Sequence, residues 1–329
     1  MPNVQPAAIL ILATLLGCAP PPGVTSDDAA TTDDTGTKPA DTGTKPVDTG
    51  VPGPFAPFAD ADLTDPDAVR GMANGVSAAK VYEAMFALAV FVPTDTTSPC
   101  PTLVEDKVAG TAEATGGCTD GDGAEWIGTV KTTSIPKSSY TIEALGWGFS
   151  SLVPCDSGAA TSESVEYTGV AVFPDGETGP FSAELGITVT TADPVSCTTS
   201  TATTSYVSYS GTLNPPPKGA NYLFSGSGRY GNDVFGKAEG STTAELIDDS
   251  VCGTEAMSGN TTITSVANTV VVTYDGSTDC DPTSTVTWTL DGTAQGELDG
   301  VTCNTAAGGG GALAVGVFSL LLAVRRRRE

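Results

Sequence analysis

The stretch ELGITVT, residues 184–190, decides the fold class, because apolar side chains alternate along it with small or polar ones. Successive side chains of a strand point to opposite faces, so Leu185, Ile187 and Val189 share one face of an extended chain. TVTWTL, residues 285–290, places valine, tryptophan and leucine opposite three threonines in the same way. Both stretches are typical of strands with one buried and one solvated face.

Similar runs continue on both sides of this segment and are separated by turn clusters such as DGDG, FPDGETGP and YDGSTD. They lie at residues 126–132, 140–149, 165–173, 205–213, 222–230 and 262–274. Roughly ten strands with short connections and no helical crossovers predict a mainly β, antiparallel meander. The same pattern excludes a parallel α/β fold, which needs a helix between consecutive strands.

A second regularity places an aromatic residue two positions before a glycine, and therefore on the same face of its strand. It occurs at Trp126 and Gly128, Tyr167 and Gly169, Tyr209 and Gly211, and Phe224 and Gly226. Glycine inside a strand marks a bend, a bulge or a close backbone approach, and a ring beside it can cover the bare backbone. We therefore expect a strongly curved sheet or partly closed barrel, with a two-sheet sandwich as the rival. The rings serve core packing or, alternatively, a carbohydrate-stacking strip.

One helical segment precedes the strands, in LTDPDAVRGMANGVSAAKVYEAMFALAVFVP, residues 63–93. Thr64 or Asp65 can cap a helix that begins near Pro66, and the apolar residues follow helical spacing. Gly71 and Gly75 weaken its first half. The sequence predicts one N-terminal helix, or a kinked pair, over about 66–92, packed on the sheet.

Composition excludes several function classes. The chain has 329 residues, a formal net charge of −25 and no histidine. So anionic a protein repels phosphate backbones, so we expect no nucleic-acid partner. The absence of histidine excludes Ser-His-Asp and Cys-His catalysis and histidine-bearing zinc sites. We expect no cofactor and no enzymatic activity.

The N-terminus predicts export. The apolar run of residues 7–16 is too short to span a bilayer but fits a secretory signal peptide over residues 1–17. It ends in Leu15-Leu16-Gly17-Cys18, which resembles the lipobox of bacterial lipoproteins. The resemblance implies that Cys18 is lipidated and, with alanine following it, that the protein goes to the outer membrane. An ordinary signal peptide with an incidental cysteine is the alternative.

Residues 18–58 predict a disordered tether. They are rich in Pro, Thr, Asp and Gly and contain the repeats DTGTKPA from Asp34, DTGTKPV from Asp41 and DTGVPGP from Asp48. The repeats offer no apolar seam for a coiled coil. A tether of roughly 40 residues could hold a domain several nanometres from a membrane. Calcium binding by the repeated aspartates is the alternative.

The tail, residues 304–329, predicts a second targeting signal. Residues 306–324 are apolar or glycine apart from Ser319, about 28 Å as a helix and just enough to span a bilayer. Four arginines, Arg325 to Arg328, follow them, and Cys303 precedes them. This combination resembles the MYXO-CTERM sorting signal of myxobacterial surface proteins, and the glycines are similar to the GlyGly-CTERM tail handled by rhombosortase. The first resemblance implies cleavage near Cys303, lipid anchoring there and surface display. It also implies the bilayer and the export and sorting machinery as partners.

Eight cysteines fit an exported domain. With Cys18 and Cys303 set aside as lipid acceptors, six remain for disulfides. Neighbours in the sequence of a meander are usually neighbours in space. We therefore favour three pairs within the β domain, which we place at residues 59–303: Cys100 with Cys118, Cys155 with Cys197, and Cys252 with Cys280.

Two acidic turns are weak candidates for chemistry. Asp120, Asp122 and Glu125 offer oxygen ligands of the kind that calcium prefers, and three aspartates surround Cys280 at positions 275, 279 and 281. Solvated turns are the simpler interpretation of both. The sequence therefore predicts a non-enzymatic envelope or surface-displayed lipoprotein with an unknown surface ligand. A calcium-assisted adhesin or carbohydrate-binding module is one alternative, and a carboxylate-based hydrolase is the other.

Overall fold

The computed structural model describes residues 53–93, 96–134, 139–175, 178–214, 221–248, 252–274, 285–299 and 301. The predicted signal peptide, most of the predicted tether and the predicted sorting tail lie outside these residues. Cys18, Cys303 and the acidic turn around Cys280 lie outside them too.

Two helices precede sixteen strands in the described residues. The helices are α1 (Pro66–Val76) and α2 (Ala78–Val90). The strands are β1 (Thr102–Asp106), β2 (Thr111–Thr115), β3 (Cys118–Thr119), β4 (Glu125–Thr133), β5 (Tyr140–Pro154), β6 (Ala160–Phe173), β7 (Gly179–Thr190), β8 (Ala192–Asp193), β9 (Thr198–Thr199), β10 (Thr203–Asn214), β11 (Asn221–Asn232), β12 (Gly236–Asp248), β13 (Cys252–Thr264), β14 (Thr269–Thr273), β15 (Thr285–Leu290) and β16 (Thr293–Asp299).

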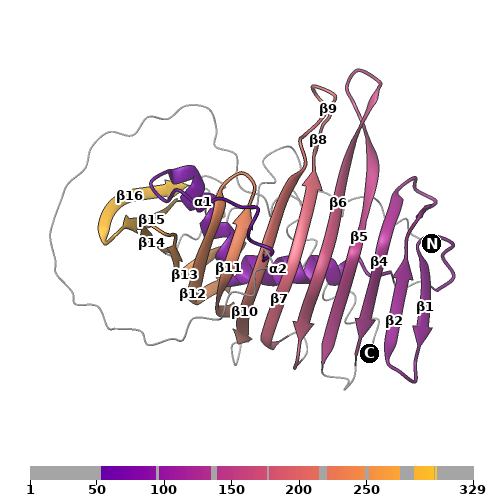
Figure 1. Ribbon diagram of the computed structural model, residues 1–329, viewed down its shortest axis with the longest axis horizontal. Helices are drawn as coiled ribbons and strands as arrows, with labels where there is room; N and C mark the ends of the chain where they lie inside the picture. The colour runs from indigo at the N-terminus through magenta and orange to yellow at the C-terminus, as the bar shows by residue number, and fades with distance from the viewer. Residues whose placement is uncertain are drawn as a thin grey trace.

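All but β8 and β9 belong to one large antiparallel sheet. Its order is β1-β2-β4-β5-β6-β7-β10-β11-β12-β13-β14-β15-β16, with β3 beside β4 and β8 paired with β9. The mainly β, antiparallel prediction is confirmed, and the strands of the path follow one another in sequence order, with β3 and the β8–β9 hairpin lying between neighbours in the sequence. The sheet is open at β1 and β16 in the described chain and is not a closed barrel (Figure 1).

The sequence missed several strands, most notably β12, and joined two others. The inward positions of β12 include Ala238, Gly240 and Thr242, whose small side chains lack the apolar alternation that marks a strand. The predicted run 262–274 is the end of β13 and all of β14, because a turn joins Ser265 to Asn268 through a backbone hydrogen bond of 3.0 Å.

Three of the four predicted glycine positions lie at irregularities of the sheet. The register shifts between β4 and β5 at Gly128, between β5 and β6 at Gly169, and between β11 and β12 at Gly226. At Gly211 and Gly226 the ring that covers the glycine comes from the neighbouring strand rather than from two residues earlier, whereas Gly128 and Gly169 meet the backbone of the neighbouring strand. A Cβ added to Gly226 would lie 2.5 Å from Tyr209. Paired residues on adjacent strands are close neighbours on one face, which explains the difference.

The predicted helical segment forms two helices that meet at Ser77. Asp65 caps α1 by accepting a hydrogen bond from Asp67 N, and Pro66 occupies its first turn. Ser77 has an extended backbone, with φ −62° and ψ 129°, so the helix cannot continue through it. Its hydroxyl then accepts a hydrogen bond from Lys80 N and caps α2. Neither helix has the length and apolar composition to cross a bilayer, and this holds for every helix of the described residues.

The break between the helices is bonded to β12 by Thr242. The hydroxyl of Thr242 donates to the carbonyl of Val76, 3.0 Å away, at the end of α1. It accepts from Ala78 N, 3.2 Å away, at the start of α2. Helix ends leave backbone groups without partners in their own helix, so a buried end needs bonds of this kind.

Glu245 completes the same connection. Its carboxylate accepts from the hydroxyl of Ser77, 2.6 Å away, and from Ala79 N, 3.0 Å away. The side chain is fully buried. The alternation of the strand would point Glu245 to the same side as Thr243, but the register of β12 against β13 shifts after Thr243, and Ala244 adopts φ 53°. The bulge therefore turns the carboxylate toward the helices.

The helices lie across one face of the sheet, behind the strands in the view of Figure 1. Val76 of α1 packs directly on Gly240 of β12, and Tyr230 of β11 fills the space beside Gly75. The buried apolar side chains of the strands point to this side and form one core with the helices. The opposite face is left for polar residues.

Removal of the charge of Glu245 should change how stability depends on pH. Burial raises the pKa of this carboxyl above its ordinary value of 4.5, although the hydrogen bonds of Ser77 and Ala79 lower it. The folded state therefore holds the proton more tightly than the unfolded chain. The contribution of the protonated Glu245 to the stability of the fold is complete below pH 4.5. This contribution is lost as the pH rises through the raised pKa of Glu245.

Glu245→Gln keeps an acceptor but cannot ionise, so its melting temperature should fall less with rising pH than that of the native chain. Calorimetry at a series of pH values measures both slopes. Glu245→Ala leaves two buried donors unpaired and should cost about 1–3 kcal/mol at every pH. Parallel slopes for Glu245→Gln and the native chain would contradict the assignment.

Gly240→Ala should destabilise the domain by about 1–3 kcal/mol, because overpacking a close contact forces neighbours to shift. The added Cβ would lie 2.4 Å from Cγ2 of Val76, a stiff side chain on α1. Gly121→Ala is the matched control, since its Cβ meets nothing within 4 Å. Denaturant titration of both variants measures the difference, and equal midpoints would show that α1 does not pack on this glycine.

Candidate functional site

Two of the three favoured cysteine pairs are disulfides in the structure. Cys100 is bonded to Cys118, with 5.8 Å between the Cα atoms, and Cys155 to Cys197, with 5.4 Å between them. The side chains of the third pair, Cys252 and Cys280, lie outside what the structure describes.

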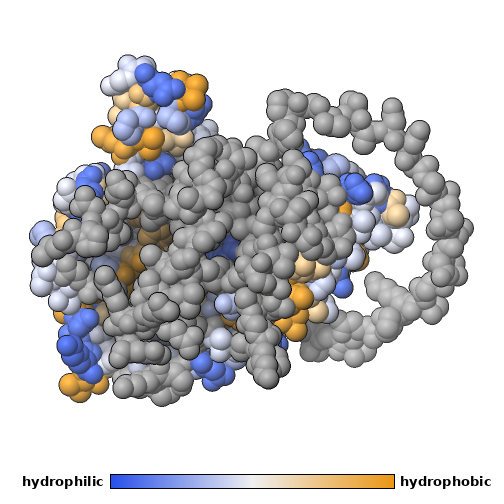
Figure 2. Space-filling model, turned by 180° about the vertical axis from the view of Figure 1, so that it is seen from behind, coloured by the Kyte–Doolittle hydropathy of each residue, from blue (hydrophilic) through white to orange (hydrophobic). Residues whose placement is uncertain are grey.

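The second disulfide fixes the tips of two hairpins. Cys155 follows β5, and Cys197 lies in the turn between β8 and β9. These tips project from the body, and Figure 2 shows hydrophilic and hydrophobic residues mixed on them. Val195 is 78% exposed and Leu152 is 71% exposed on this projection.

The predicted calcium candidates do not form a ligand cluster. One oxygen of Asp120 accepts from Asp122 N and Ala124 N, at 3.0 and 2.9 Å, and the other accepts from Nε1 of Trp126 at 2.8 Å. The carboxylate of Asp120 therefore holds the turn before β4 together. Across the described ranges, no group of three histidine, cysteine or acidic residues is placed to hold a metal ion.

The face of the sheet away from the helices carries rows of hydroxyls. One row crosses five consecutive strands, β7, β10, β11, β12 and β13, through directly paired residues. These are Ser182, Ser210, Ser227, Ser241 and Thr262. Neighbouring strands are about 4.7–4.9 Å apart, so the hydroxyls form a regular line. The sequence alternation predicted polar outward residues, but only the register aligns them.

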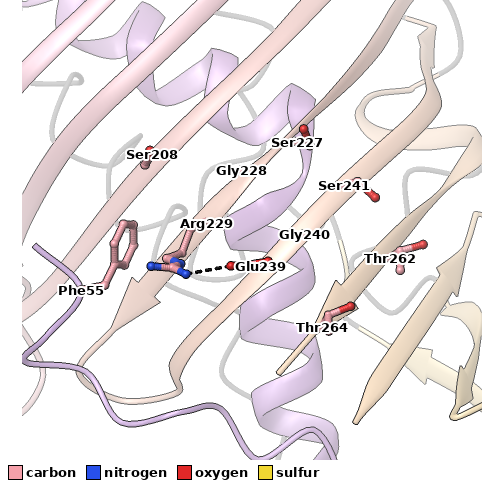
Figure 3. Close-up of a pocket in the computed structure, with 10 residues that line it drawn as sticks. All are labelled: Phe55, Ser208, Ser227, Gly228, Arg229, Glu239, Gly240, Ser241, Thr262 and Thr264. Carbon is pink, nitrogen blue, oxygen red and sulfur yellow. Dashed lines mark hydrogen bonds and ion pairs between the residues drawn. The ribbon is translucent and has the colours of Figure 1, made fainter. Parts of the chain in front are cut away.

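A pocket of about 570 Å³ lies on this face, over β10 to β13. It is lined by Phe55, Ser208, Ser227, Gly228, Arg229, Glu239, Gly240, Ser241, Thr262 and Thr264. Figure 3 shows the helix on the other side of these strands from the labelled side chains. We call this feature the outer-face pocket.

Arg229 and Glu239 form the charged centre of the outer-face pocket. The guanidinium donates to the carboxylate at 2.7 Å, and the two side chains are 47% and 67% exposed. The guanidinium also lies 5.2 Å from the ring centroid of Phe55. Two contacts therefore orient Arg229, and its bond to Glu239 uses one of five N–H groups.

Phe55 forms one wall of the pocket, although it lies in the segment predicted to be tether. Its ring is only 8% exposed and meets the ring of Tyr206 edge-on, with 5.1 Å between centroids. Phe58 is also buried, against Gly231. The chain then pairs with β12 where Ala61 N donates to the carbonyl of Lys237, 2.9 Å away. The folded domain therefore includes residues before position 59.

A second polar group borders the pocket at Glu184. This carboxylate accepts from the hydroxyl of Ser208 and from that of Tyr206, the latter at 3.1 Å. Burial, together with the charge of Glu184, raises the pKa of Tyr206 to about 12. The phenol is therefore neutral at physiological pH and acts as a donor.

Two carboxylates lie in or beside the outer-face pocket. Glu239 is the single carboxylate among the described lining residues and is ion-paired with Arg229, whereas Glu184 borders the pocket and accepts from Ser208 and Tyr206. Carboxylate-based glycoside hydrolysis needs two carboxyl groups across the scissile bond, and both of these carboxylates are engaged by neighbouring donors. The sequence missed Arg229 and Glu239 because no motif marks them; only the pairing of β11 with β12 brings them together.

Asp120→Ala should destabilise the domain, because it leaves three donors of the β4 turn without their acceptor. Loss of these hydrogen bonds should cost about 1–3 kcal/mol and change the fluorescence of Trp126. Asp122→Ala is the control, and we expect a change below about 0.5 kcal/mol. Added calcium should leave the melting temperature of the native chain unchanged. A rise of several degrees with calcium would restore the metal-site hypothesis.

Comparison of the chain with protein-family models, with curated proteins and with solved structures found no match.

Proposed function

We propose that this chain is a non-enzymatic lipoprotein of the cell envelope or cell surface that presents a binding domain. The observation that carries the proposal is the outer-face pocket, whose described lining offers several hydroxyls and one ion pair. A site of this kind can donate and accept hydrogen bonds, whereas bond cleavage needs a positioned nucleophile or acid–base partners.

The proposed location rests on the two ends of the sequence. Lipid on Cys18 would hold the protein at the outer membrane, with the bilayer and the export and sorting machinery as partners. The Pro- and Asp-rich tether would place the domain away from the membrane. The tail after Cys303 would serve as a removable sorting signal, and Cys303 as a second lipid acceptor. The odd number of cysteines left after Cys18 supports this role of Cys303.

We also propose that the sheet is strongly curved and receives the helices in its concavity. The register shifts at Gly128 and Gly226 support this shape, because bulges bend a strand and increase its twist. The close contact of Val76 with Gly240 supports it as well, since the glycine lets the helix approach the backbone.

The two rival functions draw unequal support. The hydrogen bonds of Asp120 account for the acidic turn without calcium. Both carboxylates at the outer-face pocket, Glu239 and Glu184, are held by neighbouring donors, which weighs against a hydrolase. A carbohydrate-binding module is the alternative that a specific observation favours, because the pocket is lined with hydroxyls. That role is compatible with a non-enzymatic surface protein.

Intact mass spectrometry of the native protein should show a chain that begins at Cys18 with the mass of attached lipid. It should also end near Cys303, without the arginine-tipped segment. Cys18→Ser should abolish N-terminal lipidation and release the protein from the outer membrane, while Ser26→Ala in the predicted tether is the control. A lipid-free chain that ends at Glu329 would overturn the proposed location.

A further inference from the structure

We infer that the outer-face pocket binds a neutral, polyhydroxylated chain, namely an oligosaccharide or the exposed part of a polysaccharide. The inference deepens the proposed function and rests on it, because the pocket is taken to hold the ligand without cutting it. The observations that carry it are the cavity, the kind of groups that line it and its charge balance.

The lining groups match the hydroxyls of a sugar. Ser227 and Ser241 contribute paired hydroxyls from β11 and β12, and Thr262 and Thr264 extend the set onto β13. A hydroxyl both donates and accepts, as the hydroxyls of a sugar do, so each contact can form in either direction. The cavity of about 570 Å³ is within the range of small-molecule sites.

Arg229 and Glu239 supply the directional contacts. The guanidinium is held by Glu239 and by the ring of Phe55, so its remaining N–H groups are already oriented toward the pocket side of the sheet. The exposed Glu239 offers further lone pairs as acceptors. Charge-assisted hydrogen bonds of this kind are stronger than neutral ones and set the position of a ligand.

The charge balance selects a neutral ligand. The lining contains one positive and one negative side chain, which are paired with each other, and the bordering carboxylate of Glu184 is engaged by the hydroxyls of Ser208 and Tyr206. An anionic ligand would compete with Glu239 for Arg229 and would meet the field of a chain with net charge −25. A cationic ligand would have to take Glu239 from Arg229. A neutral polyol contacts both groups without breaking the pair.

Phe55 adds an apolar wall rather than an exposed stacking platform, because its ring is almost fully covered. The wall closes one side, near β10, and the polar row continues beyond the pocket through Ser210 and Ser182. A linear ligand can therefore extend across the strands from the pocket, with weaker contacts along the row. Several such contacts add to the affinity of a multivalent polysaccharide.

The test uses the full native chain on an array of neutral and acidic oligosaccharides, followed by calorimetry with dextran as the neutral probe and polygalacturonate as the acidic one. We expect neutral saccharides to bind and acidic ones to bind more weakly or not at all. Arg229→Ala should weaken binding at least about tenfold, because it removes charge-assisted hydrogen bonds.

Thr262→Val with Thr264→Val removes two hydroxyls of the pocket at constant shape and should weaken binding several-fold. The matched control is Thr111→Val with Thr133→Val, a paired couple of half-buried threonines on the same face over β2 and β4, outside the pocket. Circular dichroism checks that each variant folds. The control should bind like the native chain.

Three results overturn the inference: no neutral saccharide binds, acidic saccharides bind better, or the pocket and control variants lose equal affinity. The mass of the saccharide after incubation separates this inference from the proposed function. A shortened saccharide would contradict the non-enzymatic proposal. If only the pocket variants lost affinity, the saccharide would still be shown to bind in the outer-face pocket. An intact saccharide whose binding ignores the pocket variants would contradict this inference alone.

Discussion

The rest of the structure depends on the hydrogen bonds that join the ends of α1 and α2 to β12. A chain that stops one helix at Val76 and starts another at Ala78 leaves backbone groups that need partners in a dry interior. Thr242 and Glu245 supply them from one strand. Because these bonds fix both helices on one side of the sheet, the apolar faces of the strands gather there, and the other side stays free for polar groups.

β12 contacts α1 on one face of the sheet and lines the outer-face pocket on the other, and its composition follows from these two sets of contacts. Its inward residues from Ala238 to Thr242 are small, so that α1 can approach and Val76 can pack on Gly240. Its outward residues, Glu239 and Ser241, line the outer-face pocket. A larger inward side chain would push α1 away, and a larger outward one would fill the pocket. The strand therefore has neither the apolar run nor the aromatic content of an ordinary strand, which is why its sequence did not reveal it.

The alternation of residues predicted the antiparallel meander, because it depends only on the period of an extended chain. It could not predict Glu245 as a buried residue, since a bulge after Thr243 reverses the side to which it points. The pairing of Arg229 with Glu239 depends on strand register, which ten residues of separation along the chain do not specify. The burial of Phe55 depends on a ring from β10, far away in the sequence, so composition assigned it to the tether.

The two faces of the sheet differ in what they contribute to stability, and this difference decides where substitutions can be accepted. Stability comes from the helix side, where the core and the buried bonds of Glu245 lie. The outward hydroxyls are exposed or half-exposed and contribute little to folding, so substitutions there change stability by small amounts. The outward positions of β10 to β13 are therefore free to vary while the fold is kept. The sheet also holds the hydroxyls in register, so the proposed ligand would meet groups that are already positioned, which reduces the entropy that binding must overcome.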